Sequence, residues 1–270
     1  MLLTSEIKFV KMHGAGNDFV MIDDRKRTFP CERGKIAALA AKGTGIACEG
    51  VILVQESSVA DFKMRFFNPD GSEAELCGNG ARCVAKFARE IGAAKTDRMR
   101  FETLAGEVRA EIVGESLVKI WMPPPKDLRA DFINSGVPHK IVSVENLVTQ
   151  DVAGEGRRIR YSEEFAPAGT NVDFVKYLPP HLAYVRTYER GVEAETGACG
   201  TGAVAAALVG VAQHEMSFPV EVRTALGYTL VIDGEFDGVT FNSVTLTGPV
   251  ATVFKGTFSG NMHLHSVHSL

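Results

Sequence analysis

The sequence has few of the features that mark a metal-binding or nucleic-acid-binding protein. Its five cysteines and seven histidines include no C-x2-C or H-x3-H pair, which is the spacing typical of zinc ligands, so no metal site is expected. Asp and Glu (33) outnumber Lys and Arg (29), which gives a formal net charge of −4. No run of basic residues forms a stripe that would follow a phosphate backbone. A small molecule is therefore a more fitting ligand than nucleic acid.

The pattern of a secretory signal or of a membrane span is also missing. The first residues alternate between apolar and polar side chains rather than forming an uninterrupted apolar segment. The longest uncharged run, 196–214, reaches membrane length but consists mostly of Gly and Ala, and we interpret it as a buried segment. Because the cytosol keeps thiols reduced and the number of cysteines is odd, no disulfide framework is expected. We expect a cytoplasmic protein that does not bind membranes.

Short strands dominate the expected secondary structure. Three segments have the pattern of a helix, namely 33–41, 80–91 and 202–214, and the last is apolar around its whole circumference, as in a helix buried inside a protein. Alternating apolar residues predict strands at 7–12, 19–23, 51–55, 62–67, 107–112, 118–122, 173–178, 182–188, 220–224, 228–232, 239–246 and 250–254.

One sequence motif occurs twice. Cys-Gly-Xaa-Gly-Ala begins at Cys77, before the second predicted helix, and again at Cys199, before the third. The three prolines at 123–125, between the two motifs, cannot continue a helix or a strand ladder and indicate a domain boundary. The sequence therefore predicts an α+β fold of two pseudo-symmetric domains, each a mixed β-barrel-like sheet wrapped around a central helix. The expected domains are 1–122, completed by about 249–258, and 123–248, followed by a polar tail at 259–270.

The two motifs predict acid/base chemistry. A cysteine at a helix N-terminus has its thiolate stabilised by the helix dipole and by free backbone N–H groups, so its pKa is expected to fall below about 8.5. The glycines let a ligand approach the backbone, and the N–H groups of the first turn form a site for a carboxylate. Inverting a stereocentre requires removing a proton from one face of a carbon and delivering one to the other face, which two facing thiols can do. Cys77 and Cys199 are therefore the candidate pair of a cofactor-independent amino-acid racemase or epimerase, whereas Cys31, Cys48 and Cys83 are interpreted as packing residues.

Several motifs together resemble the diaminopimelate epimerase family. They begin at 11–19, continue through 67–73 and 77–83, and return at 189–191 and 198–203. The resemblance covers most of the chain in the family's order. It implies an enzyme without a cofactor, expected as a homodimer, that interconverts LL- and meso-2,6-diaminopimelate in lysine and peptidoglycan precursor biosynthesis.

The resemblance also implies roles for individual residues, with Cys77 and Cys199 as the acid/base pair. The reacting carboxylate would be held at Gly78, Asn79, Gly200 and Thr201. The rest of the substrate would contact Asn17, Asn68, Asn171, Glu189 and Arg190. Of these, Arg190 would pair with the distal carboxylate in a bidentate geometry that a lysine cannot reproduce. His139 and Glu189 match positions that adjust the ionisation of the cysteines.

Three positions depart from the family's pattern. Val137 stands where an asparagine is usual, the loop at 191–198 is one residue longer, and Ala47 replaces a glycine. Because Val137 removes an amide expected at the distal end of the substrate, the alternative is a proline racemase-like enzyme or a glutamate or aspartate racemase of the same fold. A redox protein or binding module in which Cys77 and Cys199 form a reversible disulfide is a further alternative. A phenazine-biosynthesis-type isomerase is disfavoured because such enzymes lack the cysteine pair.

Overall fold

The computed structural model describes residues 6–259, which form two compact units. The first unit extends to Val118 and resumes at Val250, whereas the second is continuous from Lys119 to Pro249. The sequence placed the corresponding boundary after residue 122, beside the proline segment. Of the expected terminal tail only Ser259 belongs to the described residues, as the end of the last strand, and the histidines of that tail lie outside them.

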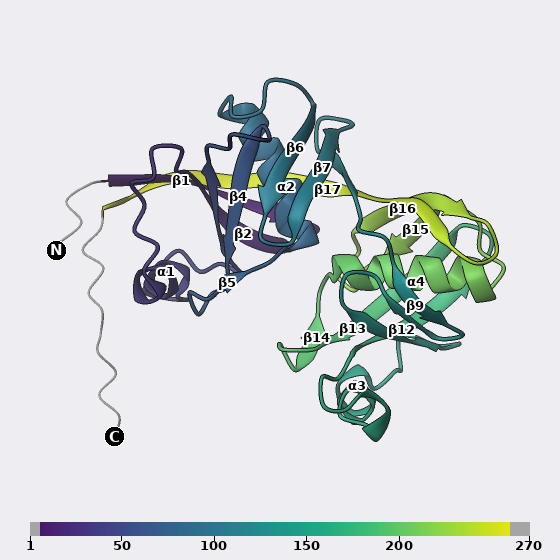
Figure 1. Ribbon diagram of the computed structural model, residues 1–270. Helices are drawn as coiled ribbons and strands as arrows, with labels where there is room; N and C mark the ends of the chain where they lie inside the picture. The colour runs from purple at the N-terminus through teal and green to yellow at the C-terminus, as the bar shows by residue number, and fades with distance from the viewer. Residues whose placement is uncertain (1–5, 260–270) are drawn as a thin grey trace, which may run out of the picture. The chain divides into compact units, whose positions relative to one another are not determined.

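In the first unit a mixed sheet surrounds helix α2 (Figure 1). Strand β1 pairs antiparallel with β2 and β17, β2 runs parallel to β3, and β3 runs antiparallel to β4. Strand β4 pairs with β5 and β6, and β6 forms a hairpin with β7. The elements are β1 (Glu6–Gly14), β2 (Asn17–Asp23), α1 (Arg33–Ala40), β3 (Val51–Gln55), β4 (Phe62–Phe67), β5 (Glu73–Ala74), α2 (Gly78–Glu90), β6 (Arg98–Thr103) and β7 (Gly106–Ile112). Strand β8 (Leu117–Trp121) begins in this unit and ends in the second.

Helix α2 is held by its burial among the strands of this unit. It contacts β1, β2, β3, β4 and β7, and its residues from Asn79 to Ala85 are buried, including the charged Arg82. The apolar side chains of Val84 and Phe87 are buried as well. Because each such side chain contributes about 1.5–3 kcal/mol when it is removed from water, the start of α2 is fixed within its unit.

Helix α1 covers a second apolar cluster of the same unit. Its Ile36 and Leu39 pack with Leu53 of β3, and all three are fully buried. The sheet of the first unit therefore packs against α1 as well as α2.

The second unit repeats this plan around helix α4 (Figure 1). Strand β11 runs parallel to β12, which pairs antiparallel with β13, and β13 pairs in turn with β14 and β15. Strand β16 lies between β15 and β17, while β10 pairs with β9 and β11. The elements are β9 (Lys126–Arg129), β10 (Phe132–Asn134), β11 (Pro138–Ser143), α3 (Val152–Arg160), η1 (Glu163–Phe165), β12 (Asn171–Leu178), β13 (Leu182–Glu189), β14 (Ala194–Thr196), α4 (Gly200–Gln213), β15 (Val220–Arg223), β16 (Thr229–Phe236) and β17 (Phe241–Ser259).

Helix α4, which is apolar in sequence, is buried among the strands of the second unit. Its residues from Gly202 to Gly210 are all buried, and it contacts β10, β11, β12, β13, β15 and β16. The Tyr177 hydroxyl on β12 donates a hydrogen bond of 2.9 Å to the carbonyl of Ala206. The predicted α+β fold, with one central helix in each half, is therefore confirmed.

Helix α3 was not expected, so the prediction of three helices is wrong. Gly154 and Gly156 weaken the helical pattern of this segment, yet Asp151 caps the helix by accepting a hydrogen bond of 2.9 Å from the backbone N–H of Gly154. Gly156 is required because an added Cβ would lie 2.5 Å from the Cβ of Tyr188. Tertiary packing therefore selects the glycine that obscures the helix in the sequence.

Two strands predicted at 239–246 and 250–254 are one strand, β17, which runs through Pro249. The pairing of β17 with β16 ends at Thr247, and its pairing with β1 begins at Val250. Neither ladder therefore requires a backbone N–H at Pro249, which a proline lacks. This strand contributes to both units.

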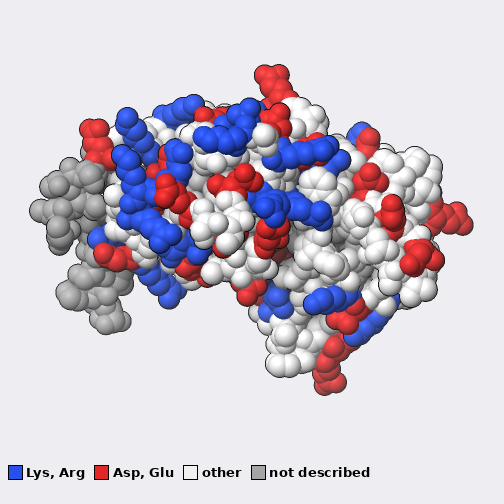
Figure 2. All heavy atoms as spheres, turned by 45° about the horizontal axis from the view of Figure 1, so that its top comes forward, with Lys and Arg blue, Asp and Glu red and all other residues white. Residues whose placement is uncertain are grey.

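Charged side chains of both signs are intermixed on the face drawn in Figure 2. Ion pairs of the described residues include those of Arg65 with Glu73 and of Arg186 with Glu195. Within the described part of the chain, none of the helices combines the length and the apolar character that a membrane span needs. Over the same residues no cluster of His, Cys, Asp and Glu side chains is arranged to hold a metal ion.

Candidate active site

Both repeated cysteines are the N-cap residues of the central helices, as predicted. Cys77 precedes α2 with extended backbone angles (φ −129°, ψ 121°), and Cys199 precedes α4 with similar ones (φ −102°, ψ 112°). The Sγ of Cys199 accepts a hydrogen bond of 3.4 Å from the backbone N–H of Gly202. Each motif therefore presents a thiol together with the N–H groups of a first helical turn, one in each unit.

The environment of Cys199 is more acidic and more enclosed than expected. Burial raises the pKa of this thiol well above its ordinary value, and the carboxylates of Glu189 and Asp173 act in the same direction. Hydrogen bonds with Thr201 and Gly202 oppose the shift but do not reverse it. The prediction that the helix N-terminus lowers the pKa is therefore wrong for Cys199, because desolvation of the thiolate outweighs the stabilisation by the helix.

A buried histidine and aspartate lie behind Cys199. His139 on β11 and Asp173 on β12 are fully enclosed, and the Nδ1 of His139 lies 2.6 Å from an Asp173 carboxylate oxygen. The Nε2 of His139 lies 3.0 Å from the Thr201 hydroxyl, which is itself 3.5 Å from the Sγ of Cys199. The structure thus connects His139, Thr201 and Cys199 within one unit. Asp173 was not predicted, although a charged residue within the buried run of β12 was a signal.

Asn171 and Arg190 belong to the same neighbourhood. The side-chain oxygen of Asn171 accepts a hydrogen bond of 2.8 Å from the backbone N–H of Arg190, and its nitrogen lies 3.4 Å from the Nε2 of His139. The Arg190 guanidinium donates to the carbonyls of Ala168 and Gly169 at 3.4 and 3.3 Å. Among residues 6–259 it forms no ion pair with a carboxylate.

In the first unit the residues after Cys77 are organised by a buried arginine. Arg82 donates to the side-chain oxygen of Asn79 at 2.7 Å and to the carbonyl of Gly78 at 3.3 Å. Burial lowers the pKa of Arg82 to about 10, and the Cys83 and Cys77 thiols counteract this shift. Arg82 is not among the residues predicted from the sequence. Its place four residues after Gly78 on α2 was the available signal, since residues at i and i+4 share a helix face.

The two other asparagines of this unit differ in how they are bonded. Asn68, directly after β4, donates from its side chain to the Ser72 hydroxyl at 3.1 Å and is thereby fixed in the loop. Asn17 begins β2, opposite Gly14 in the hairpin with β1, and its buried side-chain oxygen has no hydrogen-bond partner. A Cβ at Gly14 would lie 2.8 Å from the carbonyl oxygen of Asn79, so this hairpin approaches the start of α2. A buried acceptor without a partner is an exception in native proteins.

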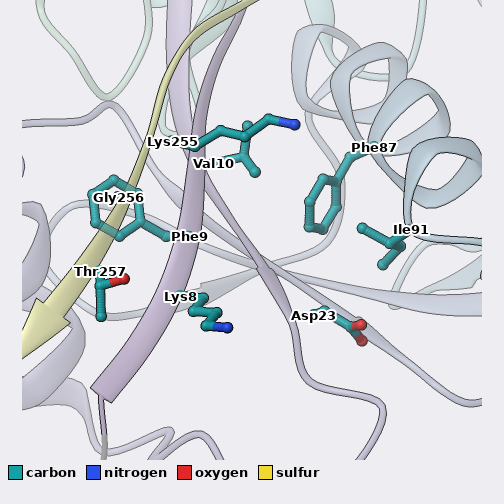
Figure 3. A pocket seen from close by; sticks show the side chains of 9 residues that line it. All are labelled: Lys8, Phe9, Val10, Asp23, Phe87, Ile91, Lys255, Gly256 and Thr257. Carbon is teal, nitrogen blue, oxygen red and sulfur yellow. The ribbon is translucent and has the colours of Figure 1, made fainter.

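The first unit also contains a hollow of about 470 Å³ away from the cysteine motif (Figure 3). It is lined by Lys8, Phe9, Val10, Asp23, Phe87, Ile91, Lys255, Gly256 and Thr257. Figure 3 shows Phe87 and Ile91 approaching it from α2, opposite the β1 residues. No residue of the Cys77 motif lines this hollow, so it is not the site of the thiol chemistry.

Comparison with known proteins places these features in a family. A model of the diaminopimelate epimerase family matches residues 9–126 and 132–253. The diaminopimelate epimerase of Aquifex aeolicus is 44% identical over 277 residues, covering 94% of this chain and 98% of that protein. The one from Chlorobaculum tepidum is 41% identical over 263 residues, covering 92% and 100%.

Solved structures share the fold at much lower identity. A phenazine biosynthesis protein of the PhzF family from Bacillus anthracis has a TM-score of 0.73 at 17% identity, covering 94% of this chain and 99% of that one. A hydroxyproline epimerase from Agrobacterium vitis has a TM-score of 0.67 at 18% identity, covering 95% and 93%. At such identities the likeness shows the fold alone.

Proposed function

The chain belongs to the diaminopimelate epimerase family and is an amino-acid epimerase, and we propose that it interconverts LL-2,6-diaminopimelate and meso-diaminopimelate with Cys77 and Cys199 as its acid/base pair. The observation that carries this proposal is the repeated cysteine at the N-cap of the central helix of each unit. Two thiols supply both proton transfers of an inversion, so no cofactor takes part. The reaction serves lysine biosynthesis and, through the same product, the supply of peptidoglycan precursor.

The proton inventory balances between the two thiols. One cysteine, as thiolate, takes the proton from the stereocentre, so that an S–H bond forms as the C–H bond breaks and the electron pair stays on carbon. The other cysteine, as thiol, donates its proton to the opposite face, and the roles exchange in the reverse direction. Cys199 is suited to begin as the thiol, because burial and the carboxylates of Glu189 and Asp173 raise its pKa.

The carbanion forms beside a carboxylate, so that carboxylate must be held by hydrogen-bond donors. The first turns of α2 and α4 offer backbone N–H groups at Gly78, Asn79, Gly200 and Thr201. Donors fixed in advance at the point where negative charge develops lower the barrier without reorganisation. These four residues are therefore assigned to the reacting carboxylate.

The remainder of the substrate is assigned to five further residues. In the first unit Asn17, at the start of β2, and Asn68, in the loop after β4, are assigned to it on the resemblance to the family. In the second unit Asn171 and Glu189 provide further acceptors. The Arg190 guanidinium, which has no carboxylate partner among residues 6–259, binds the distal carboxylate.

Val137 favours a second candidate, a racemase of proline, glutamate or aspartate. The backbone N–H of Ser135 donates to the Val137 carbonyl at 3.2 Å, and the Ser135 hydroxyl donates to the Thr201 carbonyl at 2.9 Å. The turn that contains Val137 is thus tied to the start of α4, where an apolar side chain contributes no hydrogen bond to a distal polar group. Incubation in D2O with LL-diaminopimelate, glutamate, aspartate and proline separates the candidates. Deuterium is expected at the α-carbon of diaminopimelate, and exchange with another amino acid alone would refute the first candidate.

Single substitutions test the two-thiol mechanism. Cys77→Ser and Cys199→Ser are each expected to reduce epimerisation by at least about 100-fold, because a serine hydroxyl is a far weaker acid than a thiol. Cys31→Ser, at a cysteine outside both motifs, is the control and should remain close to the wild type. Full epimerisation by both motif variants would rule the two-thiol mechanism out. The redox alternative, in which the thiols form a reversible disulfide, instead predicts that the reduced wild type does not epimerise any of these amino acids.

The quaternary state belongs to the same proposal. We expect a homodimer, as the resemblance to the family implies. Sedimentation velocity at micromolar concentration measures the mass directly, and a monomer there would contradict the expectation without affecting the assignment of the cysteines.

A further inference from the structure

A continuous chain of hydrogen bonds leads from Cys199 into the core of the second unit. It runs from the Sγ of Cys199 to the Thr201 hydroxyl (3.5 Å), on to the Nε2 of His139 (3.0 Å), and from the Nδ1 of His139 to Asp173 (2.6 Å). The Thr187 hydroxyl donates to the second Asp173 oxygen at 2.6 Å. Helix α4 and strands β11, β12 and β13 each contribute a member, and His139, Asp173 and Thr187 are buried. The proton transfers described above assign no step to His139, Asp173 or Thr187.

The donor and acceptor capacity of each group determines which atom carries each proton in this series of hydrogen bonds. An ionised carboxylate only accepts hydrogen bonds, so the Nδ1 of His139 carries the proton shared with Asp173. The oxygen of the Asn171 amide accepts from the backbone N–H of Arg190, and its nitrogen donates to the Pro138 carbonyl at 3.2 Å and lies 3.4 Å from the Nε2 of His139. In the neutral imidazole with its proton on Nδ1, Nε2 is an acceptor that receives the Thr201 hydroxyl proton, while Thr201 accepts from the thiol of Cys199.

We propose that Asp173 is a positioning residue that makes His139 the store for the thiol proton of Cys199, with the Thr201 hydroxyl as the carrier. When Cys199 becomes a thiolate, its S–H bond breaks and an O–H bond forms on Thr201. The original O–H bond of Thr201 breaks in the same step and an N–H bond forms at Nε2. The total charge of the chain does not change, and the imidazolium is balanced by Asp173. This role rests on the proposed function, since it concerns the direction in which Cys199 acts as the base.

The need for such a store follows from what surrounds Cys199. Glu189 on β13 and Asp173 on β12 are the charged groups whose fields act on this thiol, and Thr201 and Gly202 are the hydrogen-bond partners that favour the thiolate. A proton released to solvent would leave a buried thiolate facing two carboxylates, which is costly. Transfer to His139 leaves a cation two hydrogen bonds away from the new anion.

The proposal is testable because a purely electrostatic role for Asp173 predicts the opposite effect of Asp173→Asn on the ionisation of Cys199. If Asp173 acted on Cys199 only through its charge, then Asp173→Asn would favour the thiolate, as Glu189→Gln should. If Asp173 acts through His139, then Asp173→Asn makes the imidazole a weaker base and disfavours the thiolate. Removing a charge at hydrogen-bond distance from a proton acceptor is expected to change the reaction rate by about tenfold or more.

The test measures the reactivity of Cys199 without substrate. The rate of modification by methyl methanethiosulfonate, a small neutral reagent, is followed between about pH 6 and 10 by mass spectrometry of the peptide that carries Cys199, with circular dichroism to establish folding. Asp173→Asn is expected to slow the reaction at about pH 8 roughly tenfold, whereas Glu189→Gln accelerates it. An equal or faster rate in Asp173→Asn would overturn the proposal.

Two further variants, His139→Gln and Thr201→Val, test the proposal without relying on Asp173→Asn alone. His139→Gln should slow the reaction as Asp173→Asn does, and an unchanged rate would count against the store. Thr201→Val removes the hydroxyl that carries the proton between Cys199 and His139. In this background Asp173→Asn should act on Cys199 only through its charge and accelerate the reaction, the opposite of its effect in the wild type. The same sign in both backgrounds would refute the carrier. Because no turnover is measured, these results stand apart from deuterium exchange by the wild type, which tests the proposed function alone.

Discussion

Replacing Gly202 by alanine is expected to destabilise the second unit, because the glycine makes room for the Asp173 carboxylate. A Cβ at this position would overlap the Oδ1 of Asp173 and lie 3.2 Å from the Thr187 hydroxyl. That carboxylate cannot turn aside freely, since its oxygens are bonded to His139 and Thr187 at 2.6 Å. The second glycine of this motif is therefore a consequence of the buried aspartate.

The magnitude follows from opposing contributions. Overpacking of a core costs about 1–3 kcal/mol, and a hydrogen bond to a charged group that is broken costs about 1.5–3 kcal/mol. Alanine regains about 1 kcal/mol of helix propensity over glycine. The net loss for Gly202→Ala is about 1.5–5 kcal/mol.

The other copy of the motif provides the matched control. A Cβ at Gly80 would lie 2.8 Å from the Cδ1 of Ile52, which is the end of a flexible side chain, so Gly80→Ala should change stability by less than about 1 kcal/mol. The free energy of unfolding in urea is measured for both variants, with circular dichroism and tryptophan fluorescence as separate probes. A loss below about 1 kcal/mol for Gly202→Ala, or an equal loss at Gly80, would refute the explanation.

Two further predictions concern ionisation. Hydrogen bonds from the Ser72 hydroxyl and backbone N–H at 2.6 and 2.9 Å, together with Arg33, lower the pKa of the exposed Asp70 from 3.8 to about 2. Its contribution to stability is therefore present above about pH 4 and lost as the pH falls toward about 2. The difference in melting temperature between the wild type and Asp70→Asn should shrink over that range, and a constant difference would contradict the assignment. Burial raises the pKa of the Cys83 thiol to about 12, so methyl methanethiosulfonate should leave Cys83 unmodified at about pH 9 in the folded protein and modify it in urea; modification of the folded protein would show that this cysteine is exposed.

Features set by local sequence were the ones that could be predicted. The predicted bounds of helices α1, α2 and α4 lie within two residues of the observed ones, since capping and apolar pattern are local. The repeated cysteine motif identified both N-caps for the same reason. The strands that were missed are β5, β6, β9, β10, β11 and β14. Most are short, β11 begins with a proline, and β6 is rich in charged residues, so their partners in the sheet, rather than their own sequences, make them strands.

The ionisation of Cys199 could not be predicted from the sequence. The motif indicated a helix N-terminus, which lowers the pKa of a thiol, but it gave no sign of the enclosure and the carboxylates that raise it. The decisive contacts join residues far apart in the chain, since Thr201 meets His139 across 62 positions and His139 meets Asp173 across 34. Only the packing of α4 against β11 and β12 brings these side chains together.

The path of β17 through both units has a consequence for the order in which the protein can fold during its synthesis. The second unit ends at Pro249, so every residue of its sheet has been made while the first unit still lacks the partner of β1 that begins at Val250. Until then one edge of β1 is open to pairing with other chains, which is a hazard for a nascent protein. The half that begins first along the chain is therefore the half that is completed last.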